Sequence, residues 1–107
     1  MAAVITMVFS PAAESRPEFE RLLQELAAFI RSQPPDGMDS MAVLRSDAYI
    51  LVQARWRSAA DQKAFRVSPG GAKIFRAMSD CSVEPPLTYT TSEDIALSYS
   101  RAAPPSS

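Results

Sequence analysis

The chain of 107 residues contains no histidine, and this absence excludes several kinds of chemistry. Without imidazole there is no side chain that ordinarily titrates near neutral pH, no histidine ligand for a metal or haem, and no histidine-activated serine or cysteine. The sequence shows no carboxylate cluster and no glycine-rich phosphate loop in their place. We therefore expect any catalysis to proceed without a metal, a nucleotide or another cofactor.

The chain has only one cysteine and a net charge close to zero. The single cysteine, Cys81, cannot form an internal disulfide, and the N-terminal stretch "MAAVITMVF" has neither the basic start nor the length of a signal peptide. The net charge is −1 without a basic stripe, which argues against nucleic acid and anionic membranes as partners. No segment approaches the length of a membrane span. Together these features predict a cytoplasmic protein in a reducing compartment.

Hydrophobic residues make up 47% of the chain, which is typical of a folded domain and not of a disordered one. The length allows one domain with a modest core. We expect this domain to span residues 1–100. The last stretch, "RAAPPSS" at residues 101–107, is expected to be a flexible tail.

The first half of the chain predicts a strand and a long helix. Residues 4–9 are apolar and β-branched, as in a strand. Ser15 and Glu18 have the spacing of a capping box, and "QPPDG" at 33–37 stops the helix that would follow. The apolar residues between these signals recur at helical spacing and predict an amphipathic helix over about 16–32. These residues are Phe19, Leu22, Leu23, Leu26 and Ile30.

The second half predicts a hairpin over 40–57, made by a weaker strand from Met38 to Ser46 and a second arm that ends at Trp56. Ser58 would cap a short helix that runs to about Val67. "SPGG" at 68–71 would then end this helix, and a further helix would cover about 72–80. Its inward residues would be Ile74, Phe75 and Met78. Strands are expected at 87–92 and, further on, at 95–100.

The stretch "YILVQARWRS" at 49–58 alternates along the second arm of the hairpin. One face would carry Ile50, Val52, Ala54 and Trp56; the other would carry Tyr49, Leu51, Gln53, Arg55 and Arg57. Apolar side chains occur on both faces, so we expect both faces to be covered.

The order β-α-β-β-α-α-β predicts an α+β fold, namely a ferredoxin-like antiparallel sheet with its helices on one face. One such sheet leaves its other face bare, with Leu51 and Tyr49 on it. Pairing two copies sheet to sheet would bury this face, so the sequence predicts a homodimer.

Five pieces of residues 4–92 together resemble the antibiotic biosynthesis monooxygenase family. They are a strand ending in tryptophan, "YILVQARW"; a serine-capped helix, "SAADQKAF"; and then "SPGG", "AKIFRAM" and "EPP" before the last strand. The resemblance implies a dimeric α+β barrel. It cannot extend to haem-degrading relatives, which need a histidine ligand.

The resemblance is closest to the small cofactor-independent oxygenases of that family, which convert anthrone-type or phenolic aromatic polyketides to quinones with O₂. Their pattern places an asparagine four residues before the tryptophan, a tyrosine six after it and an arginine twenty after it. Trp56 and Arg76 match this pattern, whereas Val52 and Gln62 stand at the asparagine and tyrosine positions. The match implies that Trp56 and Arg76 are catalytic.

In such chemistry the protein binds an aromatic ring, stabilises its anion and excludes water. Trp56 would offer a flat face and an indole N–H to the peroxide, and Arg76 would lower the pKa of a substrate phenol. Other candidate substrate-binding residues are Val52, Gln53, Gln62, Phe65, Met78 and Tyr89.

Other interpretations remain open. A lone tryptophan on an apolar strand is often a core residue. Arg76 lies roughly 150° from the centre of the apolar face of its helix, at about 100° per residue, which is a solvent position unless a second subunit or the C-terminal segment covers it. The same fold could serve a polyketide cyclase that uses Arg76 with Asp61 or Asp80, or a non-catalytic dimer that binds a small apolar ligand.

Overall fold

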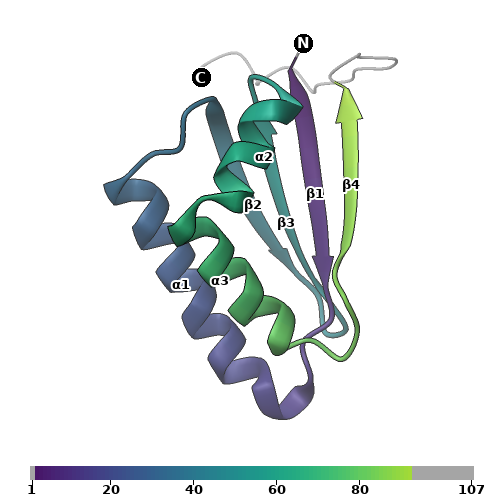
Figure 1. Cartoon of the computed structure of the whole chain (residues 1–107). Helices are drawn as coiled ribbons and strands as arrows, with labels where there is room; N and C mark the ends of the chain where they lie inside the picture. Colours follow the sequence, from purple (N-terminus) through teal and green to yellow (C-terminus); the bar gives the residue numbers. More distant parts are fainter. Residues whose placement is uncertain (1, 93–107) are drawn as a thin grey trace, which may run out of the picture.

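A computed structural model of the chain describes residues 2–92 and shows a four-stranded antiparallel sheet with its helices on one face (Figure 1). This confirms the predicted ferredoxin-like α+β fold. The strand expected at 95–100 and the tail expected at 101–107 lie outside the described residues. The elements are β1 (Ala3–Phe9), η1 (Ala13–Ser15), α1 (Arg16–Ser32), β2 (Met38–Arg45), β3 (Ile50–Trp56), α2 (Ala59–Val67), α3 (Pro69–Asp80) and β4 (Leu87–Ser92).

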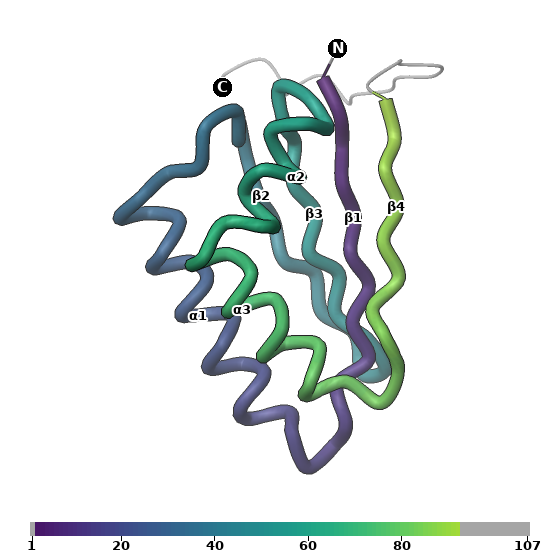
Figure 2. Tube along the Cα trace, in the orientation of Figure 1, coloured from purple at the N-terminus to yellow at the C-terminus, as the bar shows by residue number. Residues whose placement is uncertain are grey.

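The sheet has the strand order β2-β3-β1-β4, so the hairpin β2–β3 lies beside β1, and β4 is the outermost strand on the other side among residues 2–92. Alternation in β3 is as predicted: its buried side chains face the helices, and they are Ile50, Val52, Ala54 and Trp56. Figure 2 follows the chain from the end of α1 into β2, which brings these two elements together at one side of the sheet. No helix within residues 2–92 is long and apolar enough to cross a membrane.

Helix α1 begins and ends where the sequence predicted, but the prediction of a capping box at its start was wrong. Ser15 has helical dihedral angles (φ −96°, ψ −2°) because it is the last residue of η1, and its side chain forms no cap. The carboxylate of Glu18 accepts a hydrogen bond from Nε of Arg21 at 2.9 Å instead of reaching back to residue 15. The preceding 3₁₀ turn therefore leads directly into the helix.

The "SPGG" stretch separates the two later helices, but α3 begins earlier than expected. Ser68 ends α2 and caps α3: its hydroxyl accepts a hydrogen bond from the Gly71 N–H at 3.3 Å, and Pro69 takes the first helical position. Both glycines thus lie in the first turn of α3. A Cβ at Gly70 would lie 2.5 Å from Cζ of Phe29, so this glycine allows α1 and α3 to pack closely.

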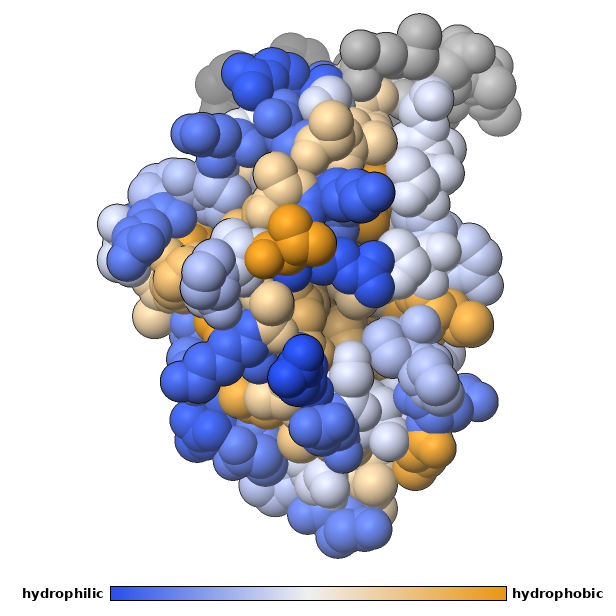
Figure 3. All heavy atoms as spheres, in the orientation of Figure 1, coloured by the Kyte–Doolittle hydropathy of each residue, from blue (hydrophilic) through white to orange (hydrophobic). Residues whose placement is uncertain are grey.

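The core fills the space between the sheet and the helices, and no polar or charged residue among residues 2–92 is buried in it. Phe65 on α2 is its aromatic centre. The ring of Phe65 lies 5.8 Å from Trp56, 6.0 Å from Phe75 and 6.1 Å from Phe29, measured between centroids. The outward side of the helical layer is mostly hydrophilic, with a few isolated hydrophobic spots (Figure 3).

The face of the sheet that points away from the helices carries a continuous apolar row. Leu44, Leu51, Val8 and Leu87 lie opposite one another in register across all four strands. Leu44 and Leu87 are more than half exposed. Within one chain, this open face therefore presents aliphatic side chains to solvent.

Candidate functional site

A small cavity lies between the sheet and the helices, with Trp56 in its wall. Its volume is about 20 Å³, enough for one water-sized molecule and too small for an aromatic ring. Its lining residues come from three strands and all three α-helices. They are Ile5, Met7, Ile30, Met38, Met41, Val52, Ala54, Trp56, Gln62, Phe65 and Phe75.

Only two polar side chains line this cavity. Neither the indole N–H of Trp56 nor the side-chain amide of Gln62 has a hydrogen-bond partner within residues 2–92. No side-chain nitrogen or oxygen in this part of the chain is both buried and unpartnered, so both groups reach space that a small molecule can enter. Both polar side chains therefore have donors that are not engaged elsewhere in the described chain, and no charged side chain lines the cavity.

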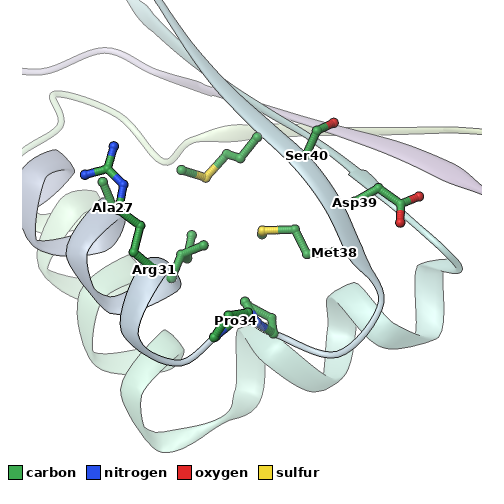
Figure 4. A pocket seen from close by; sticks show the side chains of 9 residues that line it. Ala27, Arg31, Pro34, Met38, Asp39 and Ser40 are labelled. Atoms are coloured by element: carbon green, nitrogen blue, oxygen red, sulfur yellow. The ribbon is translucent and has the colours of Figure 1, made fainter.

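A larger hollow adjoins the cavity at the protein surface, between the end of α1 and the start of β2 (Figure 4). It measures about 270 Å³. Ile30, Met38 and Met41 line both the hollow and the cavity. These three side chains therefore separate the space beside Trp56 from the surface.

The structure brings together four of the residues singled out from the sequence. Trp56, Val52, Gln62 and Phe65 all line the cavity, and Trp56 is only 2% exposed. The alternation of β3 and the helical position of α2 place them there. Val52 and Gln62 thus lie beside the tryptophan, although they are not the asparagine and tyrosine of the resembling oxygenases.

Arg76 is not brought to the cavity. It is exposed on the outer face of α3, in a surface hollow that Lys73 and Asp80 also line. The reason is the helical period, because Ile74 and Met78 on the same helix face the core. The Trp56–Arg76 pair expected from the resemblance therefore does not form within one chain.

The remaining three candidates also lie elsewhere. Gln53 is on the open face of the sheet, where its Nε2 donates a hydrogen bond to Oγ1 of Thr6 at 3.2 Å. Tyr89 is on the same face in β4 and is 55% exposed. Met78 is fully buried in the core beneath α3 but does not line the cavity.

The acid–base groups of a cyclase are not assembled at this cavity either. The Asp61 carboxylate accepts hydrogen bonds from Nε of Arg57 at 2.9 Å and from the Ser58 hydroxyl at 3.0 Å. The Arg57 bond is the main reason why the pKa of Asp61 is lowered, which makes it a weaker base. Asp80 lies beside Arg76 on the other side of the helical layer.

Sequence reasoning missed Met38, Arg31 and Phe75 as residues of the site. Met38 and Arg31 line the hollow, and Met38 and Phe75 line the cavity. The signal for Met38 was its inward position at the start of β2, next to the turn that ends α1. Within residues 2–92, no group of three or more acidic or cysteine side chains could hold a metal ion.

No protein-family model and no curated protein matches the sequence. Solved structures do match the fold. Rv0793 from Mycobacterium tuberculosis is 19% identical with a TM-score of 0.76, and the match covers 91% of this chain and 100% of that one. A candidate antibiotic biosynthesis monooxygenase from Deinococcus radiodurans is 17% identical with a TM-score of 0.77, covering 92% and 99%.

A third match is a variant of SnoaB, a cofactor-independent oxygenase from Streptomyces nogalater. It is 20% identical with a TM-score of 0.70, and the match covers 89% of this chain and 96% of SnoaB. This chain shares their fold. Several further matches are also named as candidate antibiotic biosynthesis monooxygenases, so the resemblance inferred from the sequence is confirmed at the level of the fold.

Proposed function

We propose that the chain is a cytoplasmic, cofactor-independent monooxygenase that oxidises an anthrone or phenol of the aromatic polyketide class to a quinone. The observation that carries the proposal is the pair of unpartnered donors, the Trp56 indole N–H and the Gln62 amide, in the wall of one apolar cavity. The shared fold with SnoaB supports it.

The reaction needs little from the protein. The substrate loses a proton, and its anion passes one electron to O₂. The radical pair then combines to a peroxide anion, which takes up a proton in place of the one that the substrate lost. The resulting hydroperoxide loses water, so that a CH₂ group and O₂ become C=O and H₂O. Preorganised donors that face the developing negative charge on oxygen lower the barrier, and an apolar wall excludes competing water. Trp56 and Gln62 are the donors in this proposal, and Val52 and Phe65 are the wall.

The volumes of the cavity and of the hollow suit different parts of the reaction: the cavity suits O₂ and the hollow suits the aromatic ring. About 20 Å³ accommodates O₂ or the peroxide oxygen atoms, whereas the ring would lie toward the larger hollow. Arg76 has no role in this proposal because its side chain lies on the outer face of α3. The cavity supplies no cation, so the substrate anion would form by ionisation in solution, and the rate should rise with pH.

Oxygen consumption tests the proposal. Purified protein with chelator should consume O₂ when supplied with anthrone-type substrates, and Gln62→Ala and Trp56→Phe should each reduce the rate by about tenfold or more. Arg76→Gln is the matched control and should leave the rate unchanged. Thermal unfolding shows whether each variant is folded. An absence of O₂ uptake across a panel of anthrones and naphthols would refute the proposed activity.

We also propose that two copies pair through the open face of the sheet. The aliphatic row of Leu44, Leu51, Val8 and Leu87 supports this, because such a row exposes apolar surface in one chain. A two-fold pairing of identical faces would bury it.

A second candidate is a non-catalytic dimer that binds a small apolar ligand. The small volume of the cavity and its lack of charged side chains favour this function. Ligand binding that is unaccompanied by O₂ uptake would distinguish it from the oxygenase.

A further inference from the structure

The hollow between the end of α1 and the start of β2 has an apolar wall with one cation on its rim. The cation is Arg31, and the apolar wall is formed by Ala27, Ile30, Pro34, Pro35, Met38 and Met41. We propose that this hollow is the binding subsite and entrance for a flat aromatic ligand that bears a carboxylate, with Arg31 pairing with that anion. The proposal rests on the proposed function in so far as it concerns the same site.

The position of the hollow makes it an entrance. Ile30, Met38 and Met41 line both the hollow and the Trp56 cavity, so the two spaces lie next to each other. Figure 4 shows the Met38 side chain projecting into the hollow and the Arg31 side chain lying along α1 beside Ala27. Methionine side chains are unbranched and flexible, so Met38 can move without a shift of the backbone.

The charges around the hollow select an anion. Five arginines of residues 2–92 form ion pairs with carboxylates: Arg16, Arg21, Arg45, Arg55 and Arg57. Arg31 forms none within this part of the chain. Asp39 is the one carboxylate in the lining; it is paired with Arg55, and its side chain points away from the hollow (Figure 4). The charge offered to a ligand is therefore positive.

The volumes limit the ligand's size and orientation. The hollow of about 270 Å³ is near the lower end of ligand pockets, which corresponds to one or two fused rings. A ring in the hollow with its carboxylate at Arg31 would direct another edge toward Met38 and the donors behind it. Arg31 would thereby bind and orient the substrate.

Two probes of the same shape isolate the charge: 2-naphthoate and 2-naphthamide. Because the chain has a single tryptophan, its one indole N–H signal in a ¹⁵N-correlated NMR spectrum reports occupancy beside the cavity. We expect naphthoate to bind about fivefold more tightly than naphthamide. Arg31→Gln should abolish this preference and Arg31→Lys should keep most of it. Arg76→Gln, an exposed arginine outside the hollow, should not change it.

Equal affinity for the two probes, or an equal loss of preference in Arg76→Gln, would overturn the proposal. So would binding that leaves the indole signal unmoved. Ala27→Phe should fill the hollow and weaken both probes. If this variant fails to fold, Arg31→Glu at an exposed position should weaken naphthoate alone. All titrations are done without turnover, so a protein that binds naphthoate through Arg31 but consumes no O₂ would refute the proposed function and leave this inference standing.

Discussion

The carboxylate of Asp61 occupies the space into which a side chain at Gly37 would project. A Cβ at Gly37 would lie 2.5 Å from Oδ2 of Asp61, and the φ of Gly37 is +83°, a conformation that residues other than glycine rarely adopt. The Gly37 carbonyl also accepts the N–H of Arg57 at 2.7 Å. The turn into β2, which borders the hollow, is thus held against the start of α2.

Replacement of this glycine should be costly. We expect Gly37→Ala to lower the free energy of unfolding by about 1–3 kcal/mol, because the substitution adds backbone strain and displaces Asp61. Urea denaturation measures the change. Gln33→Ala, in the same connection but exposed, is the control and should change stability by less than about 0.5 kcal/mol. A Gly37→Ala variant as stable as this control would contradict the account of the turn.

Acid should weaken the ion pair between Asp61 and Arg57 at the start of α2, beside the Gly37 turn. The hydrogen bond from Arg57, followed by that from Ser58, lowers the pKa of Asp61 below its ordinary value of 3.8. Folding therefore favours the ionised carboxylate. Its contribution is complete above pH 3.8 and is lost as the pH falls from there through the lower pKa of the folded state.

Melting temperatures across the acid range measure this effect. Asp61→Asn keeps an acceptor but cannot titrate, so its stability should depend less steeply on pH than that of the unmodified chain. Some slope should remain, because arginine partners also lower the pKa values of Glu18 and Glu20. Identical pH profiles for the two proteins would show that the Asp61 pair does not contribute to acid stability.

The open face of the sheet should control assembly. Leu51→Arg places a charge in the middle of the aliphatic row, so it should convert a dimer into a monomer that is still folded. Sedimentation velocity measures the mass, and circular dichroism checks the fold. Gln24→Arg, on an exposed position of α1, is the matched control and should remain dimeric. An unmodified chain that sediments as a monomer at high concentration would rule out the pairing.

Local periodicity was sufficient to predict most of the fold. The apolar spacing from Phe19 to Ile30 fixed the face of α1, and the alternation from Ile50 to Trp56 fixed the buried face of β3. The predictions failed where tertiary contacts decide. Whether Ser15 caps α1 depends on the preceding 3₁₀ turn, which the sequence did not predict. The early start of α3 follows from the Ser68 cap and Pro69, and Gly70 in its first turn leaves room for the ring of Phe29.

The sequence could predict which residues of the site lie together only where they belong to the same helix or strand. Trp56 and Val52 share a strand face, so their proximity follows from a period of two. Arg31 and Met38 come from two elements that meet across a proline-containing turn, and nothing in the sequence spacing gives the hollow between them. Arg76 stands at the arginine position of the resembling oxygenases, yet it lies on the outer face of α3. A matching spacing from Trp56 was therefore not enough to place it at the site.

All six residues of β4 are exposed, and among residues 2–92 β4 pairs only with β1. Within the described part of the chain, backbone hydrogen bonds to β1 are therefore its main attachment, and local opening begins at such segments. We expect β4 to open locally more readily than β1 and β3, whose inward side chains are buried. Its amide hydrogens would exchange fast in an isolated chain and slowly once another surface covers Leu87 and Tyr89. Protection of the β4 amides would therefore report whether the open face of the sheet is covered.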